Sequence, residues 1–360
     1  MGKLLLEKHK LMYHPDVLDK FKRGEKFAPV NLELSIATIC NQACQNCYVK
    51  NLIEDKRSPA LMDGDLLMKI IRDSADFGVK SITVCGTGEP LIHPRLGEAI
   101  RLIKAGGMDT ALVTNGVLGS REKMEEYFGD LTYYRISTTA GSPARYADLQ
   151  GSSEEAFARL LRNLEELVAL KRDKNLKTTM GAAYFLLPGC EEDMYSFTAR
   201  MKEIGLDYVQ IKPLGDFKKA DYEYEKSHYK MVNEELRRCE SLNDDKFTCL
   251  VRYSRFEDFE KMAAGFKDLP KECWALYFTA VIGTDGKLYT CGGSWYEAKD
   301  CYGDLSQNTL KEIWQSERWQ QIFSRRMHIN CDECFFACRN NELNKYLENF
   351  REEPAHINFI

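Results

Sequence analysis

The strongest constraint on the fold of this chain is the regular alternation of strand-like and helix-like segments between residues 31 and 213. The first strand, 32–38, alternates apolar and polar side chains, and the next segment, 63–77, carries apolar residues at helical spacing. Further strands are predicted at 80–85, 110–113, 133–138, 178–187 and 208–213, and further helices at 95–105, 121–127, 153–171 and 191–204. Strands joined by such helices pair in parallel through right-handed crossovers. The sequence therefore predicts an α/β fold, a partial (β/α)6 TIM-like barrel with its site at the carboxyl ends of the strands.

Four segments are predicted along the 360 residues. These are an N-terminal extension (1–30), the barrel (31–215), a polar, Lys/Glu-rich helical linker (216–268) and a cysteine-rich C-terminal domain with a final helix (269–360). Within the barrel, the helix over 153–171 is expected to begin at a capping box, with Ser152 at the N-cap and Glu155 three residues later.

Composition argues against two classes of partner. The net charge of −5 gives no electrostatic reason to expect binding to nucleic acid or to an anionic membrane surface. No stretch approaches a membrane span, and no secretory signal begins the sequence, so we expect a cytoplasmic protein. A reducing compartment disfavours disulfides, and the 13 cysteines are therefore expected to bind metal where they cluster.

Three cysteines follow the first strand at the spacing C-x3-C-x2-C: Cys40, Cys44 and Cys47. Thiolate ligands select iron–sulfur clusters, zinc or Cu(I). A structural zinc site takes four ligands and a [4Fe–4S] cluster has four irons, so three cysteines from one loop leave one position open. Incidental cysteines and part of a zinc knuckle are the alternatives that this loop alone leaves open.

This spacing resembles the signature of the radical S-adenosylmethionine (SAM) enzymes. In that family the amino and carboxylate groups of SAM chelate the open iron, and an electron from the cluster splits SAM into methionine and a 5′-deoxyadenosyl radical. The resemblance thus implies SAM, a [4Fe–4S] cluster and a flavodoxin- or ferredoxin-type electron donor. Family members usually carry an aromatic residue just before the third cysteine. This chain has Asn46 there and Tyr48 after it, and Tyr48 is our candidate for the adenine side of SAM.

A second motif, Gly86-Thr87-Gly88-Glu89-Pro90, follows the second strand. It is not a dinucleotide fingerprint, because Leu91 stands where the third glycine is needed. The radical SAM resemblance implies instead that this turn meets the amino group of SAM. Glu89 would accept a charge-assisted hydrogen bond, and Gly88 would allow close backbone approach. A glycine-rich turn without a cofactor role is the alternative.

The same resemblance implies three further contacts with SAM. Asn115 follows the third strand and Ser137 ends the fourth, where the family contacts the ribose or methionyl groups of SAM. Ile211, on the sixth strand, would pack against the adenine. An ordinary loop or core role is the alternative for each of the three.

The C-terminal segment carries a second group of cysteines. Cys273 and Cys291 flank a predicted hairpin over 276–290, whose turn contains Asp285-Gly286. Beyond them lie Cys301 in a connecting loop and the run C-x2-C-x3-C, formed by Cys331, Cys334 and Cys338. The pattern resembles the SPASM/twitch extension of radical SAM enzymes and implies an auxiliary [4Fe–4S] cluster, with the shorter, one-cluster twitch form fitting better. A structural zinc ribbon is the alternative.

The resemblance implies an enzyme that removes a hydrogen atom from its substrate. Only about thirty residues precede the first strand, too few for a leader-peptide recognition domain. We therefore expect a small polar substrate of carbohydrate or aminocyclitol type and an oxidoreductase (dehydrogenase) outcome. The alternatives are a peptide- or protein-modifying enzyme, a non-enzymatic zinc-binding protein, and an epimerase. The epimerase would need a cysteine as hydrogen donor, and the candidates, which otherwise read as buried small hydrophobes, are Cys85, Cys190, Cys239 and Cys249.

Overall fold

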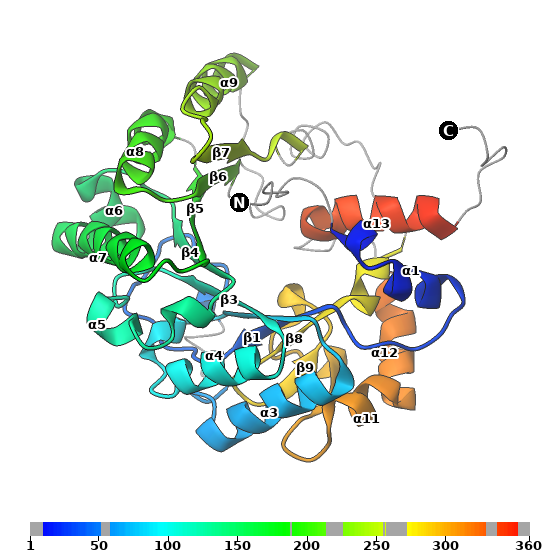
Figure 1. Cartoon of the computed structure of the whole chain (residues 1–360). Helices are drawn as coiled ribbons and strands as arrows, with labels where there is room; N and C mark the ends of the chain where they lie inside the picture. Colours follow the sequence, from blue (N-terminus) through cyan, green and yellow to red (C-terminus); the bar gives the residue numbers. More distant parts are fainter. Residues whose placement is uncertain are drawn as a thin grey trace.

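One continuous sheet of ten strands curves through the molecule, with helices along its outer side (Figure 1). The computed structural model describes residues 10–51, 58–187, 189–213, 226–254, 256, 272–328 and 337–351. The strand order is β10-β9-β8-β1-β2-β3-β4-β5-β6-β7. The strands are β1 (Asn31–Ser35), β2 (Ser81–Cys85), β3 (Asp109–Thr114), β4 (Tyr133–Thr138), β5 (Thr179–Leu186), β6 (Tyr208–Pro213), β7 (Thr248–Val251), β8 (Thr279–Ile282), β9 (Lys287–Tyr289) and β10 (Cys301–Asp304).

The predicted partial barrel is confirmed: β1 to β6 pair in parallel in the order of the sequence. The helices that join them lie on the convex side of the sheet in Figure 1. They are α3 (Gly64–Phe77), α4 (Leu96–Ala105), α5 (Arg121–Met124), α6 (Pro143–Leu149), α7 (Glu154–Asp173) and α8 (Glu191–Ile204). Each crossover from one strand to the next therefore returns the chain to the same end of the sheet.

The two faces of the sheet differ in what they bury. On β4, Tyr134 and Ile136 are fully buried and belong to the main hydrophobic core, which they share with the outer helices. Successive side chains of a strand point to opposite faces, so Arg135 and Ser137 point to the concave face, which we call the inner face. The core thus lies between sheet and helices, and the inner face is left for other chemistry.

Four strands beyond the six extend this sheet, and the sequence did not predict their places in it. The segment expected to be a helical linker contains α9 (Lys226–Glu240) but also β7, which pairs in parallel with β6. With only four residues, β7 is too short to show a clear alternation. At the other edge, β8 pairs in parallel with β1, so the predicted hairpin of β8 and β9 continues the barrel sheet directly.

One predicted helix start is corrected. Helix α7 has Ser153, not Ser152, at its N-cap, and the Ser153 side chain accepts a hydrogen bond from the backbone N–H of Ala156. Ser152 instead donates its backbone N–H to Ala147 at the end of α6. Because this bond ties Ser152 to α6, helix α7 begins one residue later than the sequence pattern suggested.

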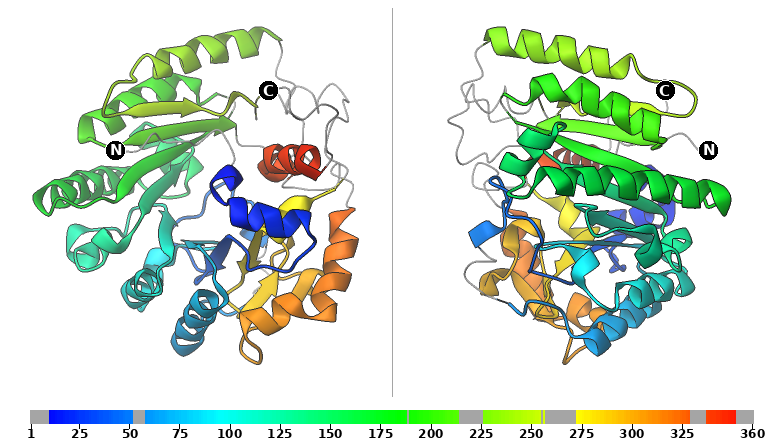
Figure 2. Two further views of the ribbon diagram at one scale, coloured as in Figure 1. Left: turned by 45° about the vertical axis from the view of Figure 1, so that its right-hand side comes forward. Right: turned by 90° about the vertical axis from the view of Figure 1, so that its left-hand side faces the viewer.

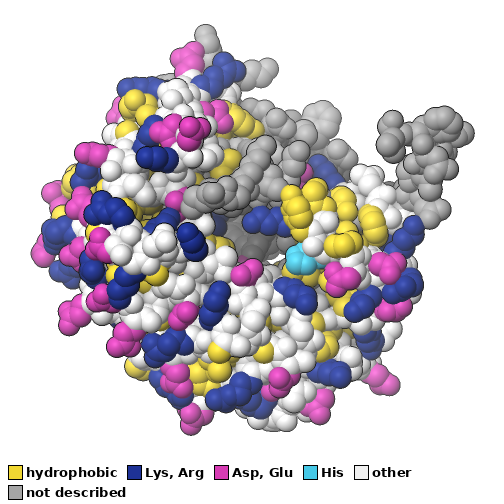
Figure 3. All heavy atoms as spheres, in the orientation of Figure 1, with side chains coloured by type: hydrophobic (Ala, Val, Ile, Leu, Met, Phe, Trp, Pro, Cys, Tyr) yellow, Lys and Arg dark blue, Asp and Glu magenta, His cyan; other side chains and the backbone are white. Residues whose placement is uncertain are grey.

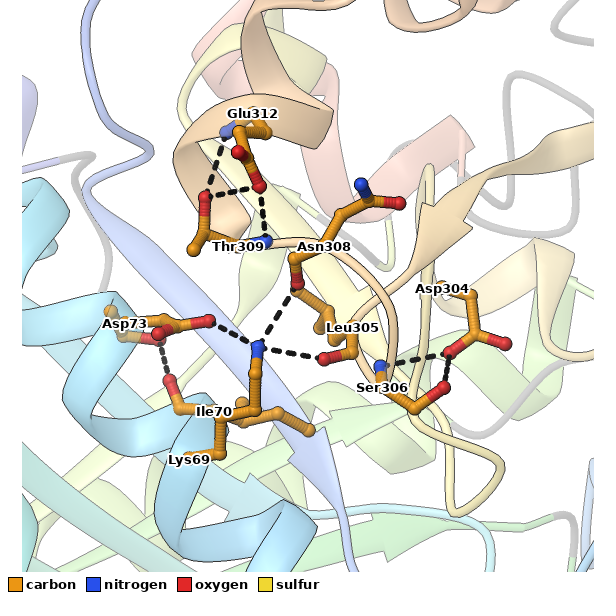
Figure 4. A network of polar contacts seen from close by, with 10 residues as sticks. Lys69, Ile70, Asp73, Asp304, Leu305, Ser306, Asn308, Thr309 and Glu312 are labelled. Atoms are coloured by element: carbon orange, nitrogen blue, oxygen red, sulfur yellow. Dashed lines mark hydrogen bonds and ion pairs between the residues drawn. The ribbon is translucent and has the colours of Figure 1, made fainter.

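The C-terminal part of the chain is tied to the barrel through α3. The Lys69 ammonium group donates to the Asp73 carboxylate within α3 and to the backbone carbonyls of Leu305 and Asn308, at 2.8, 2.9 and 3.1 Å (Figure 4). The loop that supplies these carbonyls leads into α11 (Leu310–Gln315), which begins with a capping box between Thr309 and Glu312.

A second, smaller core joins the two ends of the described chain. Helix α1 (Pro15–Lys22) contributes Leu18 and Phe21, and α13 (Ala337–Arg351) contributes Leu347. Trp274 and Phe278 also belong to it, and the views in Figure 2 show α1 and α13 side by side. Helix α12 (Glu317–Met327) packs along β10. Among the described residues, no helix is both long and apolar enough to cross a membrane. The four segment boundaries stay predictions.

Candidate cofactor site

The three clustered cysteines lie in the loop that leaves β1. Cys40 is exposed, whereas Cys44 and Cys47 are half-buried. Burial, followed by the nearby charges of Cys47 and Cys40, raises the pKa of Cys44 to about 12. Burial likewise raises the pKa values of Cys40 and Cys47. The three thiols are therefore close enough to feel one another's charge, and binding of a cationic metal group would relieve that repulsion.

The cysteine loop is held in place by α6 and the turn that follows it, which the sequence pattern did not indicate. The Gln42 amide donates to the Tyr146 hydroxyl at 2.6 Å, and the Cys44 thiol donates to Gln150 Oε1 at 2.8 Å. Gly151 has φ +50°, and a Cβ there would lie 2.3 Å from the Ala43 carbonyl oxygen. A glycine after a short helix that begins with proline was the available signal.

The donor set fits an iron–sulfur cluster better than a single ion. Among the described residues, no three His, Cys, Asp or Glu side chains are close enough together to hold one metal ion. A [4Fe–4S] cluster does not require that convergence, because each iron takes its own thiolate. Cys40, Cys44 and Cys47 would supply three irons, and the fourth would stay open to another ligand.

The glycine turn after β2 packs directly on the start of this loop. The Glu89 backbone N–H donates to the Ile39 carbonyl at 2.9 Å. A Cβ at Gly88 would lie 2.3 Å from that same carbonyl oxygen, so no other residue fits without a backbone shift. Gly88 is therefore required for contact between the two motifs, and its approach to SAM stays a prediction.

Glu89 is only 2% exposed, and its carboxylate is hydrogen-bonded to neighbouring protein groups. Its oxygens accept hydrogen bonds from the Leu91 backbone at 2.9 Å, the Thr114 hydroxyl at 2.5 Å and the Asn115 backbone at 2.8 Å. Burial raises the pKa of Glu89, and these hydrogen bonds oppose the rise. About four acceptor positions exist on a carboxylate, so roughly one is left for a ligand. Its predicted contact with the SAM amine stays a prediction.

Asn115 and Ser137 lie at the carboxyl ends of their strands, as predicted. The Asn115 amide donates to Asn41 Oδ1 at 2.8 Å and approaches Cys40 Sγ at 3.8 Å, so it reaches the cysteine loop. Ser137 is half-buried on the inner face of β4. Their contacts with SAM stay predictions.

Ile211 lies in the main core, and its predicted contact with adenine stays a prediction. Ile211 is fully buried and pairs in register with Tyr184, whose ring packs against Phe197 of α8 at 5.3 Å. Its side chain thus points to the outer helices. Lys212 and Phe185 are the pair on the inner face, with the Lys212 Nζ 4.4 Å from the ring centroid.

Tyr48 combines a half-exposed ring with an enclosed hydroxyl. The residue is 52% exposed, but the hydroxyl lies among Cys85, Trp295 and Tyr296. Burial is the main cause that raises the Tyr48 pKa above its ordinary value. The exposed ring lies beside the cysteine loop, and its packing on adenine stays a prediction.

A tyrosine from the C-terminal region, missed by the sequence reasoning, also reaches the glycine turn. The Tyr296 hydroxyl lies 3.3 Å from the Thr87 hydroxyl and 3.1 Å from the Thr284 hydroxyl. Its backbone has φ +61°, which a tyrosine adopts only when its surroundings require it. The C-terminal region therefore contributes to the wall around the first motif.

The C-terminal cysteines are only partly described. Cys273 and Cys291 both lie near the Tyr302 hydroxyl, where their charges raise the Tyr302 pKa further after burial. Cys301 packs in a different cluster, with Val49 and Trp295. Of the other predicted ligands, Cys331 and Cys334 lie outside the described residues, as does the side chain of Cys338 in α13.

The four candidate hydrogen donors separate into two groups. Cys190, Cys239 and Cys249 are buried in the main core toward the outer helices. Cys85 ends β2 on the inner face, half-buried, and burial raises its pKa to about 12, with Arg135 opposing the rise. Of the four, Cys85 is the one in position to meet a ligand inside the barrel.

Two family models match the chain. The one described as the radical SAM superfamily matches residues 34–193, and the SPASM model, described as an iron-sulfur cluster-binding domain, matches residues 273–339. The first spans β1 to the start of α8, and the second begins at Cys273.

Curated relatives are similar over different lengths. A tungsten-containing aldehyde ferredoxin oxidoreductase cofactor-modifying protein of Pyrococcus furiosus is 24% identical over 330 residues, covering 84% of this chain and 86% of that protein. A probable GTP 3′,8-cyclase of Methanococcus vannielii is 31% identical over 130 residues, covering 36% of this chain and 43% of that protein.

Solved structures share the fold. Streptococcus suis SuiB bound to S-adenosylmethionine has a TM-score of 0.63 at 15% identity, covering 94% of this chain and 78% of that one. A histidine-tagged anSMEcpe with bound AdoMet has a TM-score of 0.58 at 16% identity, covering 87% of this chain and 88% of that one.

Proposed function

Because the chain belongs to the radical SAM superfamily and carries an iron–sulfur cluster-binding SPASM domain, we propose that it dehydrogenates a polar small molecule held inside its barrel. The cofactors of such an enzyme are SAM, the [4Fe–4S] cluster that binds it and an auxiliary iron–sulfur cluster. When bound, they supply a 5′-deoxyadenosyl radical that removes a hydrogen atom from the substrate, and a one-electron acceptor for the substrate radical. The substrate loses the remaining proton to solvent or to a base.

Residues of the chain would hold the two clusters and position the segments around them. Cys40, Cys44 and Cys47 would hold the first cluster, at a loop fastened by the turn after α6. Glu89 and Asn115 connect the glycine turn and the end of β3 to that loop. In the C-terminal domain, Cys273 and Cys291, together with Cys331, Cys334 and Cys338, are the proposed source of auxiliary-cluster ligands.

The observation that carries the substrate class is the polar lining of the inner face. The Asn31 amide on β1 donates to the hydroxyls of Ser81 and Thr83 on β2, at 2.9 and 3.2 Å. The Thr83 hydroxyl accepts this bond and keeps its own hydrogen to donate, so such a wall suits a hydroxyl-rich molecule of carbohydrate or aminocyclitol type. The relatives named for modifying a cofactor and for cyclising GTP also favour a small molecule. The likeness to peptide-bound structures concerns the fold alone.

Epimerisation is the second candidate outcome, and the position of Cys85 favours it. A substrate radical could regain a hydrogen atom from the Cys85 thiol, which its raised pKa keeps protonated at neutral pH. The resulting thiyl radical would then need one electron from the reductant and one proton from water. We propose a flavodoxin- or ferredoxin-type protein as the reductant for both outcomes, and a cytoplasmic location where thiols stay reduced.

An isotope experiment tests the substrate class. Anaerobically reconstituted enzyme, SAM and reductant are incubated with a deuterium-labelled cell extract that has been divided into small-molecule filtrate and protein retentate. We expect 5′-deoxyadenosine to acquire deuterium from the filtrate, and the Cys40→Ala, Cys44→Ala, Cys47→Ala triple variant to form none. Deuterium that comes from the retentate alone would show a protein substrate instead.

A further inference from the structure

Arg135 stands in the middle of a row of residues that crosses the inner face. Strand pairing aligns Arg135 on β4 with Val113 on β3 and Gly181 on β5, and Gly181 with Tyr208 on β6. Neighbours of Arg135 along β4, Tyr134 and Ile136, point outward into the core. The guanidinium group is therefore presented to the inside of the barrel from its central strands.

Gly181 allows Tyr208 to lean toward Arg135. A Cβ at Gly181 would lie 2.2 Å from the Tyr208 ring, so the ring occupies the space where a side chain of β5 would stand. The Tyr208 hydroxyl thereby comes next to the guanidinium group, whose charge opposes the rise in the Tyr208 pKa that burial causes. Any residue larger than glycine at position 181 would push the ring away.

The charge of Arg135 has no counter-ion in the described part of the chain. No carboxylate there forms an ion pair with it, and its Nε is buried without a hydrogen-bond partner. It also lies near the Cys85 thiol, where its charge opposes the rise in the Cys85 pKa, and near the Tyr133 ring, 5.9 Å from the ring centroid. Arg135 is half-buried and its Nε is out of contact with water, and proteins normally satisfy such a donor with a hydrogen-bond acceptor or an opposite charge. The missing partner points to a ligand.

We propose that Arg135 binds an oxyanion of the substrate, a carboxylate or a phosphate group. The planar guanidinium group donates two parallel hydrogen bonds to either oxyanion, and Tyr208 would fix its orientation. Lys212, four residues after Tyr208 on the same face, adds positive charge on the same wall. Figure 3 shows a hollow near the middle of the molecule, with both Lys or Arg and Asp or Glu side chains at its border.

The position of Arg135 separates this subsite from the expected SAM site. Ser137, a predicted SAM contact, lies two residues closer to the carboxyl end of β4 on the same face, a rise of about 7 Å. The oxyanion would thus bind deeper in the barrel than SAM. The inference rests on the proposed function, because it refines the substrate class to a hydroxyl-rich molecule that also carries an acidic group.

Calorimetry on the anaerobic, SAM-loaded holoenzyme tests this subsite with two probes, pyrophosphate and malonate. Wild type is expected to bind at least one of them, which identifies the oxyanion as phosphate or carboxylate. Arg135→Gln should weaken that binding at least tenfold, and Arg135→Lys should weaken it less. Arg159→Gln, on the outer surface of α7, is the matched control and should bind as wild type.

Two further measurements keep the outcomes distinct. SAM affinity and substrate-free SAM cleavage should change by less than about twofold in Arg135→Gln, because the proposed subsite does not contact SAM. The loss of a charge-assisted hydrogen bond to SAM would lower its affinity by more than about twofold. Binding of neither probe to wild type, equal binding to Arg135→Gln, or a comparable loss of SAM affinity would overturn the inference. Failure of wild type to cleave SAM would instead reject the proposed function.

Discussion

Glu89 Oε2 accepts a hydrogen bond of 2.8 Å from the backbone N–H of Asn115, which ties the turn after β2 to the end of β3. The Asn115 side chain continues the connection to Asn41 in the cysteine loop. A single buried carboxylate therefore fixes the relative positions of two predicted SAM-binding segments. We therefore expect a change at Glu89 to lower SAM affinity whether or not the carboxylate contacts SAM directly.

Glu89→Gln should lower both SAM affinity and stability. A glutamine amide group cannot accept hydrogen bonds with both of its heavy atoms, so a donor among Thr114 and the Leu91 and Asn115 backbones would lose its partner. We expect a loss of about 1–3 kcal/mol in the free energy of unfolding and weaker SAM binding, measured by denaturant titration and calorimetry. Glu122→Gln, on the surface of α5, is the control. Unchanged stability and unchanged SAM affinity would show that the hydrogen bonds of the Glu89 carboxylate are dispensable.

Gly88→Ala should disturb the cysteine loop without touching a thiol. The added methyl group would lie 2.3 Å from the Ile39 carbonyl oxygen, and backbone cannot yield as a side chain does. The expected cost is about 1–3 kcal/mol of stability with reduced iron uptake, measured by denaturation and iron analysis. Gly129→Ala meets only the end of the Leu176 side chain at 3.0 Å and serves as control. Normal iron uptake by Gly88→Ala would contradict the predicted coupling.

Iron analysis tests the two predicted clusters. Reconstituted wild type should hold about eight irons per chain, and the Cys40→Ala, Cys44→Ala, Cys47→Ala variant about four. The variant should also lose SAM cleavage, because the auxiliary cluster alone would leave no iron for SAM. Stoichiometric zinc with almost no iron in wild type would reject both clusters.

The repeated strands and helices of the barrel could be predicted because apolar side chains recur at the spacing typical of a strand or a helix in each of them. β7 was missed because four residues are too few for a period, and its place depends on pairing with β6. The orientation of Ile211 toward the core could not be predicted for a related reason. Adjacent residues of a strand point to opposite faces, so an error of one residue moves a side chain from the barrel interior to the core.

The inner wall could not be predicted from local patterns. Arg135, Gly181 and Tyr208 lie far apart in the sequence and meet only through the register of three strands. The turn after α6 that holds the cysteine loop depends in the same way on long-range packing. The cysteine spacing indicated the chemistry, whereas the substrate-facing groups required the structure.

The position of Cys85 makes the choice between dehydrogenation and epimerisation testable with one variant. Cys85 lies on the inner face, and its pKa of about 12 means that the S–H bond is retained up to strongly alkaline pH. The thiol exchanges its proton with solvent, so hydrogen return from Cys85 in deuterated water would place one deuterium on the product. Dehydrogenation, which we favour, gives a product two hydrogens poorer and unlabelled at that carbon. Mass spectrometry of turnover in deuterated water separates the two outcomes.

Cys85→Ala and Cys190→Ala form the matched pair for this experiment, because Cys190 is buried toward the outer helices. If the enzyme dehydrogenates, both variants should form the oxidised product. Cys85→Ala would then change only the packing of the pocket. A product of unchanged oxidation level that carries one solvent deuterium in wild type and in Cys190→Ala, but not in Cys85→Ala, would reject dehydrogenation. It would establish Cys85 as the hydrogen donor of an epimerase.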